Sequence, residues 1–154
     1  MVEIITADSK DAKEILELQS LAYQSEAKLY NDWSLPALTQ TIESLHKEFK
    51  DSIILKATIK NKIVGSVRAK VENGVCKIGR LIVNPDYQGQ GIGTALLNRI
   101  EKMQENINDF ELFTGSKSIS NIRLYEKQGY AKSHTKSLSE NVTLIFMAKP
   151  SKSL

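Results

Sequence analysis

Apolar positions in the first third of the chain follow two different periods. Residues 2–7 favour a strand, and over residues 11–24 apolar side chains recur three and four positions apart, as on one face of a helix. A second helix is predicted over residues 34–49, because Pro36 is tolerated in a first helical turn and an apolar stripe follows it. The segment 27–33 between these helices is aromatic and polar, so no helix is predicted there.

The remainder of the chain alternates short β-rich runs with two helical stretches. The polar turn at 60–62 and the Asn73-Gly74 pair each favour a hairpin. The predicted strands cover residues 53–59, 63–71, 75–83, 110–114, 130–134 and 142–148, and the predicted helices cover 92–103, with a core face that reaches Met103, and 118–128. The resulting order, βααβββαβαββ, predicts a mixed α/β sheet flanked by helices.

Length and charge narrow the class of protein. The chain has 154 residues, which predicts a single domain over residues 1–150 followed by a tail at 151–154. The formal charge of +3 is small, with 21 basic and 18 acidic side chains interspersed, so neither nucleic acid nor an anionic membrane is predicted as a partner. No apolar run approaches the roughly 20 residues that span a bilayer.

Cysteine and histidine usage adds three expectations. Cys76 has no second cysteine to form an internal disulfide, and no charged-then-apolar leader opens the chain, so a cytoplasmic protein is expected. Cys76 is interpreted as a small core residue rather than a nucleophile, because nothing beside it in the sequence would lower its pKa. Neither histidine nor cysteine occurs in metal-ligand spacing, so no metal is predicted.

A glycine-rich loop joins the predicted strand 75–83 to the helix that begins at Ile92. Gly89, Gly91 and Gly93 leave the backbone of this loop open to a ligand. The helix adds unpaired N–H groups and the positive end of its dipole. Such a loop suits a pyrophosphate group.

Two common nucleotide-binding motifs fit this loop poorly. A dinucleotide-binding G-x-G-x-x-G motif would have its third glycine at Thr94, and it belongs after the first strand of a βαβ unit rather than in mid-chain. A P-loop is excluded because no Gly-Lys-Ser or Gly-Lys-Thr follows the glycines. A plain turn between a strand and a helix remains as an alternative.

Two motifs together resemble a known family. The pattern Gln88-x-x-Gly91-x-Gly93, after a strand that ends in Val-x-Pro, resembles the pyrophosphate loop of the GNAT superfamily of acyl-CoA N-acyltransferases. The run Leu-Tyr-Glu-Lys-Gln-Gly-Tyr at 124–130 is similar to the Leu-Tyr-Glu-x-x-Gly-Phe/Tyr ending of a helix in that family. Both motifs lie in the family's order, and the resemblance covers nearly the whole chain.

The resemblance implies a GNAT-like fold whose sheet is partly splayed where the strands ending at Val83 and Thr114 part. It implies acetyl-CoA as co-substrate, with its pyrophosphate in the glycine loop and its pantetheine arm on the backbone of the preceding strand. The residues implied to bind it are Leu81, Ile82, Val83, Gln88, Gly89, Gln90, Gly91, Ile92, Gly93, Thr94, Ser118, Asn121 and Lys127.

The family's reaction makes three chemical demands. Direct attack of an amine on the thioester needs a base for the amine, a donor for the developing oxyanion and an acid for the departing thiolate. The resemblance implies that the backbone N–H of Val83 is the oxyanion donor and that Tyr125 is the acid. The alternative interpretation of Tyr125 is a core aromatic residue with a satisfied hydroxyl group.

Two positions depart from the family pattern. Many members carry an asparagine seven residues before the tyrosine, where this chain has Ser118, and Asn121 is expected to take over the contact. A glutamate that often serves as the base would fall at Phe113, which has no proton acceptor. The base is therefore unassigned, and the candidates are Glu26, Asp32, His46, Glu72 and an ordered water.

The resemblance also implies that the acceptor binds between the first two helices and the last hairpin. The candidates to line that site are Tyr23, Tyr30, Asn31, Trp33 and Leu38, and Arg80 is a candidate to meet a substrate carboxylate. The expected function is an N-acetyltransferase that acts on a small amine or a peptide amine in a ternary complex, as a monomer or homodimer. The alternatives are an acyl-CoA-binding regulatory module with little turnover and a peptide or protein N-acetyltransferase.

Overall fold

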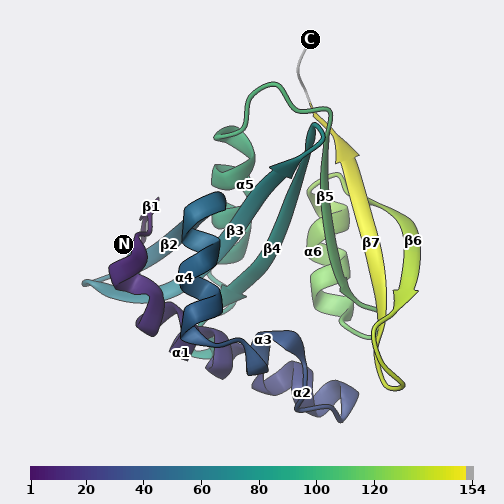
Figure 1. Ribbon diagram of the computed structural model, residues 1–154, viewed down its shortest axis with the longest axis horizontal. Helices are drawn as coiled ribbons and strands as arrows, with labels where there is room; N and C mark the ends of the chain where they lie inside the picture. Colours follow the sequence, from purple (N-terminus) through teal and green to yellow (C-terminus); the bar gives the residue numbers. More distant parts are fainter. Residues whose placement is uncertain (152–154) are drawn as a thin grey trace.

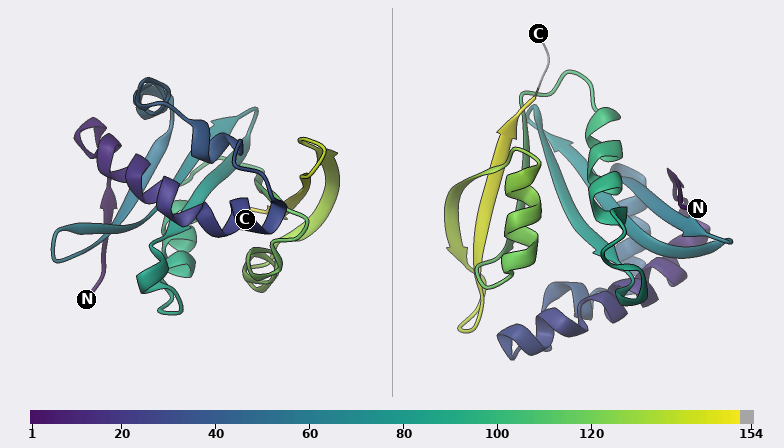
Figure 2. Two further views of the ribbon diagram at one scale, coloured as in Figure 1. Left: turned by 90° about the horizontal axis from the view of Figure 1, so that it is seen from below. Right: turned by 180° about the vertical axis from the view of Figure 1, so that it is seen from behind.

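The computed structural model describes residues 1–151, which form a seven-stranded sheet with helices on both faces (Figures 1 and 2). The strands are β1 (Glu3–Thr6), β2 (Ile53–Ile59), β3 (Lys62–Glu72), β4 (Val75–Val83), β5 (Asp109–Gly115), β6 (Ala131–Ser137) and β7 (Thr143–Pro150). The helices are α1 (Ala12–Ala22), α2 (Gln24–Tyr30), α3 (Pro36–Thr39), α4 (Ile42–Asp51), α5 (Ile92–Lys102) and α6 (Ile119–Lys127), with 3-10 turns at Ser9–Asp11 and Pro85–Tyr87. The predicted mixed α/β sheet is confirmed.

The strand order across the sheet is β1-β2-β3-β4-β5-β7-β6, and β4 with β5 is the parallel pair among otherwise antiparallel neighbours. Successive side chains of a strand point to opposite faces. In β2, Ile54 accordingly packs with Leu18 of α1 and Leu45 of α4, whereas Leu55 packs with Leu96 of α5. The two faces of the sheet thus carry separate apolar cores.

The sheet opens between its two central strands. β4 and β5 pair only over Val75–Lys77 and Asp109–Glu111, and beyond these residues the strands diverge (Figure 1). In Figure 2 the opening lies between α5 and α6, and α1 and α2 run across its end. The predicted splay is therefore present, and it leaves the backbone of the second half of β4 without a partner strand on that side.

A β-bulge changes the direction of β4 at the opening. The register between β3 and β4 shifts between Ser66 and Arg68, and Arg80 has a φ of 50°. A bulge adds one residue to one strand and redirects its side chains. The side chains of Arg80 and Leu81 are thereby aimed differently from those of the regular part of β4.

Two predictions for the first third of the chain were wrong. Residues 24–30 form α2, because Ala27 and Tyr30 lie one turn apart and are both buried, and the helix ends at Asn31 in the left-handed conformation. The helix predicted over 34–49 is divided into α3 and α4. Gln40 is extended between them, and its side chain accepts a hydrogen bond from Gln19 of α1 at 3.0 Å. Four helices therefore separate the first two strands.

Smaller differences concern the ends of elements. Met103, predicted on the core face of a helix, lies just after α5 and is 39% exposed. The last hairpin is longer than predicted, since β6 extends to Ser137 and β7 to Pro150. Of the predicted tail at 151–154, only Ser151 belongs to the described residues. Within residues 1–151, no helix is both long enough and apolar enough to cross a membrane.

Candidate active site

The glycine loop forms the first part of the candidate site. Gly89 and Gly91 have φ values of 79° and 80°, a conformation that side-chain-bearing residues rarely adopt. A Cβ atom at either position would meet no protein atom within 4 Å, so both backbones border open space. Gly91 is the N-cap of α5, and the first helical bond runs from Ala95 N–H to its carbonyl at 3.0 Å. The N–H groups of residues 92–94 therefore have no acceptor within the helix.

A cavity of about 390 Å³ lies beside this loop, and we call it the glycine-loop cavity. Its walls come from the end of α1, the start of α2, the end of β4, the loop and α6. The lining residues are Ala22, Tyr23, Ser25, Glu26, Leu81, Ile82, Val83, Tyr87, Gln88, Gly89, Gly91, Ile92, Gly93, Thr94, Ser120, Asn121 and Leu124. An anionic group in this cavity would meet free backbone donors and the positive end of the α5 dipole.

The open edge of β4 contributes backbone groups to the same cavity. The N–H of Asn84 donates to the carbonyl of Val64 in β3 at 2.8 Å. Adjacent backbone groups in a strand point to opposite sides, so those of Val83 face away from β3. On that side β5 has already diverged, and the polar backbone of Val83 is open to a ligand.

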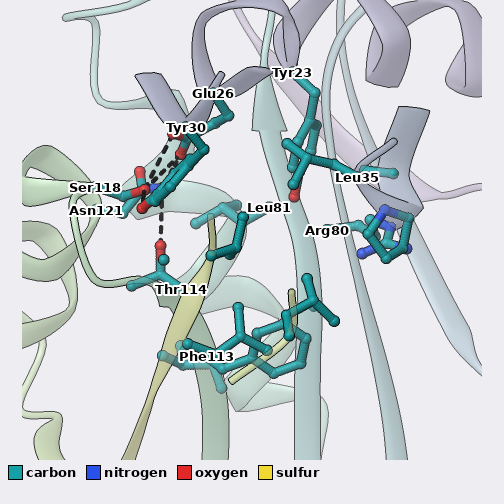
Figure 3. Close-up of a pocket in the computed structure, with 18 of the residues that line it drawn as sticks. Tyr23, Glu26, Tyr30, Leu35, Arg80, Leu81, Phe113, Thr114, Ser118 and Asn121 are labelled. Atoms are coloured by element: carbon teal, nitrogen blue, oxygen red, sulfur yellow. Dashed lines mark hydrogen bonds between the residues drawn. The ribbon is translucent and has the colours of Figure 1, made fainter. Parts of the chain in front are cut away.

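A second cavity of about 220 Å³ lies deeper in the opening, and we call it the inner cavity (Figure 3). Helices α2, α3 and α6, strands β4, β5 and β7 and residues 138–142 surround it. The lining residues are Tyr23, Glu26, Tyr30, Leu35, Pro36, Ala37, Ile78, Gly79, Arg80, Leu81, Leu112, Phe113, Thr114, Gly115, Ser118, Asn121, Tyr125, Leu138, Val142 and Leu144. Four residues line both cavities, namely Tyr23, Glu26, Leu81 and Asn121. The two cavities therefore meet beside these side chains.

A hydrogen-bonded cluster fixes Glu26 at this junction. Ser118 Oγ donates to the Glu26 carboxylate at 3.0 Å and lies 2.7 Å from the hydroxyl of Tyr30. Asn121 Nδ2 donates to the same carboxylate at 3.2 Å and lies 3.3 Å from Thr114 Oγ1 (Figure 3). The predicted contact residues Ser118 and Asn121 thus both hold a carboxylate from α2, 95 residues away from Asn121 in the chain.

Tyr125 of α6 lies in the wall of the inner cavity and is 6% exposed. Its ring packs edge-on against Tyr130 at 6.1 Å between centroids. Burial raises the pKa of the Tyr125 hydroxyl, and the nearby Tyr23 and Glu26 raise it further. The phenol is therefore protonated at neutral pH, as a proton donor must be.

Two arginines lie close together on the paired strands β3 and β4, and Arg80 of this pair lines the inner cavity. Arg68 of β3 is 4% exposed and is paired with Glu48 at 2.9 Å. Burial lowers the pKa of Arg68, Glu48 raises it, and Arg80 lowers it, so the two guanidinium groups repel each other. Arg80 makes no ion pair with the described acidic residues, and its buried Nε has no hydrogen-bond partner.

The other predicted site residues fall in different places. Asn31 and Trp33 lie outside both cavities, with Trp33 53% exposed, and Leu38 packs beside Tyr30 and Leu35 without lining either cavity. Gln90 is exposed beyond the lining of the glycine-loop cavity. Lys127 borders a separate surface cavity near the chain's C-terminal strand.

The four side chains that are candidates for the general base lie in different parts of the structure. Of the four, Glu26 alone lines the two cavities. Asp32 accepts hydrogen bonds from Ser34, which lower its pKa, and Glu72 pairs with Lys77 at the distant β3–β4 turn. His46 is exposed on α4. Cys76 is fully buried, and burial raises the pKa of its thiol to about 11, which agrees with a core residue.

Several lining residues have no signal in the sequence. Leu35, Val142 and Leu144 form one apolar cluster with Tyr30, although they come from segments more than 100 residues apart. Their side chains are ordinary core residues in composition and spacing, so only the docking of the last hairpin beside α3 brings them together.

Comparisons with known proteins point to one family and one fold. A family model described as an acetyltransferase (GNAT) domain matches residues 17–151. Among solved structures, the ribosomal-protein-S18-alanine N-acetyltransferase from Escherichia coli superposes with a TM-score of 0.81, at 19% identity over 100% of this chain and 96% of that chain. PaiA N-acetyltransferase from Thermoplasma acidophilum, solved with coenzyme A, gives 0.79 at 18% identity, covering 97% and 99% of the two chains.

A curated relative is longer than this chain. UPF0157 protein YqkA from Bacillus subtilis is 27% identical over 133 residues, which are 86% of this chain and 38% of that protein. The chain therefore corresponds to well under half of that relative.

Proposed function

The chain belongs to the GNAT acetyltransferase family, and we propose that it transfers an acetyl group from acetyl-CoA to the amine of a small-molecule acceptor by direct attack. The observation that carries this proposal is the junction of the two cavities at Tyr23, Glu26, Leu81 and Asn121. A thioester that enters from the glycine-loop cavity and an amine that enters from the inner cavity would meet beside the Glu26 carboxylate. Direct transfer needs such a meeting point for two substrates.

The glycine-loop cavity suits the co-substrate. The backbone around Gly89 and Gly91 borders open space that a side chain would fill, and the start of α5 offers free N–H groups to a pyrophosphate. The backbone of Leu81 and Val83 at the open edge of β4 would pair with an extended arm in the manner of an added strand. Acetyl-CoA supplies the activated acetyl group.

The remaining steps are assigned to groups of this chain. Glu26 accepts the proton that the attacking amine loses as its nitrogen bonds to the acetyl carbon. The Val83 N–H donates to the carbonyl oxygen as charge develops there. Tyr125 gives its proton to the sulfur as the carbon–sulfur bond breaks. Glu26 then releases its proton to solvent, and Tyr125 takes a proton back from solvent. The products are an N-acetyl amine and coenzyme A with a free thiol.

The shape of the inner cavity favours a small acceptor over a peptide. The hairpin tip is tied to the end of α2, since Ser139 Oγ donates to Asp32 at 3.2 Å and Asn141 Nδ2 donates to the Asn31 carbonyl at 3.2 Å. These contacts close the cavity on the side where Leu138 and Val142 line it. At about 220 Å³ the cavity is smaller than the roughly 300–1,000 Å³ of sites for drug-sized ligands.

The test is release of free thiol from acetyl-CoA by the wild-type protein, with small amines, polyamines, amino acids and peptides as acceptors and the Tyr125→Phe variant alongside. We expect amine-dependent release that falls by about tenfold to a thousandfold in the variant, because a general acid is lost, while acetyl-CoA affinity is retained. Saturable acetyl-CoA binding with no release from any amine would instead favour a regulatory binding module.

A further inference from the structure

Arg80 occupies a backbone position that disfavours it. Among the described residues other than glycine with a φ in the left-handed region, Arg80 alone lies inside a strand, and the others lie in turns or at a helix end. This conformation is unfavourable for a residue that bears a side chain, and such outliers gather at functional sites. The bulge itself does not require a long side chain, since the adjacent position 79 is a glycine. Arg80 lines the inner cavity, at the edge formed with Leu35 (Figure 3), and it also borders a surface cavity beside α4.

Arg80 has no carboxylate counterion within the described residues. Arg68 has Glu48 as its counterion, whereas the group beside Arg80 is the Tyr23 hydroxyl and no carboxylate among residues 1–151 pairs with it. The Nε atoms of both arginines are buried without an acceptor. A guanidinium group that is partly removed from water without a counterion is costly. An anionic group on a ligand in the inner cavity would supply the missing partner, and a carboxylate matches the planar fork of arginine.

The opposite charge lies across the same cavity. The Tyr23 side chain stands between Glu26 on one side and Arg80 on the other (Figure 3). The pKa of Tyr23 is raised mainly by burial and responds to both neighbours, since Arg80 lowers it and Glu26 raises it. The cavity therefore presents an anion at the junction with the glycine-loop cavity and a cation at its far end.

Apolar side chains form much of the remaining wall. Leu35, Val142 and Leu144 are buried in one cluster, and Phe113 packs against Phe146 at 5.1 Å between ring centroids. None of these four lining residues offers a side-chain hydrogen bond to a polar substituent. The part of a ligand that lies against this wall is thus predicted to be apolar.

We propose that the acceptor is a free amino acid with an apolar side chain, its amine beside Glu26 and its carboxylate on Arg80. The proposal rests on the proposed acetyl transfer, and the product would be an N-acetyl amino acid. Lengthening the acceptor into a peptide would replace the carboxylate by a neutral amide and leave Arg80 without its partner.

The first experiment compares acceptors that differ only in the carboxylate. Thiol release from acetyl-CoA is measured with L-leucine, L-leucinamide and 3-methylbutylamine, and with L-phenylalanine, L-phenylalaninamide and phenethylamine. We expect kcat/KM for the amino acids to exceed that for the amides and amines by at least about tenfold, on the scale of a charge-assisted hydrogen bond. In Arg80→Gln this preference should fall toward one, whereas Arg99→Gln, which removes an exposed arginine on α5, should keep it.

A second experiment separates this inference from the proposed function. Binding of L-leucine and L-phenylalanine to the protein saturated with coenzyme A is measured by calorimetry, for the wild type and for Arg80→Gln. Binding that is lost in Arg80→Gln, with coenzyme A affinity retained, supports the inference even if no acetyl transfer occurs. Acetyl transfer without a carboxylate preference, a preference unchanged in Arg80→Gln, better turnover of peptides, or no amino acid binding would each overturn it.

Discussion

The hydroxyl group of Tyr30 occupies the position that a Cβ atom on Gly115 would take. That hydroxyl accepts a hydrogen bond from the Lys117 N–H at 2.9 Å and lies 2.7 Å from Ser118 Oγ. A glycine at the end of β5 therefore lets α2 approach the start of α6. The approach places Glu26 within hydrogen-bonding distance of Ser118 and Asn121.

The first prediction concerns this approach. Gly115→Ala should force Tyr30 away, lower the free energy of unfolding by about 1–3 kcal/mol as overpacking does, and reduce acetyl transfer because Glu26 loses its support. Thermal denaturation and thiol-release assays measure the two effects. Gly79→Ala is the matched stability control, because an added Cβ there meets nothing within 4 Å. If both variants lose the same free energy of unfolding, the contact with Tyr30 is not the reason why residue 115 is a glycine.

The second prediction concerns the base. Glu26→Gln keeps the shape of the side chain but removes the proton acceptor, so kcat should fall by about 100-fold or more while the KM for acetyl-CoA stays within about twofold. Steady-state kinetics with the best acceptor measure both constants. Glu72→Gln is the control, since that carboxylate lies at the distant β3–β4 turn, outside both cavities. A kcat unchanged in Glu26→Gln would remove Glu26 from the mechanism.

The third prediction concerns the glycine loop. Gly91→Val puts a β-branched residue at a φ of 80° and a side chain into the glycine-loop cavity, so the Kd for coenzyme A should rise by at least about tenfold. Calorimetric titration measures the affinity. Gly74→Ala has nearly the same φ of 79° at the distant β3–β4 turn, and it should lower stability without changing the affinity. Unaltered binding in Gly91→Val would argue against the loop as the pyrophosphate site.

The fourth prediction concerns pH. Because burial raises the pKa of Tyr125, the phenol stays protonated and able to donate as the pH rises, and this capacity is lost only above the raised pKa. The kcat of the wild type should therefore not decline between neutral pH and about pH 10, where an unperturbed tyrosine ionises. Tyrosinate absorbance of the wild type minus that of Tyr125→Phe should show no titration in this interval. A titration step there would mean that Tyr125 is exposed to water.

The glycine loop and the motif of α6 could be predicted from the sequence because their geometry is local. Gly89 and Gly91 have the positive φ values that glycine favours, and Gly129 follows α6 with a φ of 99°. The hairpins at 60–62 and 73–74 were predicted for the same reason. Short stretches of chain decide these conformations, and their residues reveal them.

The prediction failed where distant contacts decide the structure. Helix α2 has only seven residues, too few to be stable alone, and it is held by the burial of Ala27 and Tyr30. The break at Gln40 follows from its bonds to side chains of α1 and β3. Neither helix boundary depends on a local period of apolar residues.

The sequence by itself determined the family, the order of most strands and helices, and the position of the glycine loop, since each rests on residues close together in the chain. The tertiary structure alone decided which of four candidate bases lies at the junction of the cavities, and that Arg80 lines the inner cavity. Those choices depend on α2, β4, α6 and the last hairpin meeting around one opening in the sheet. Packing between such distant segments sets the geometry of the site, and no local pattern encodes it.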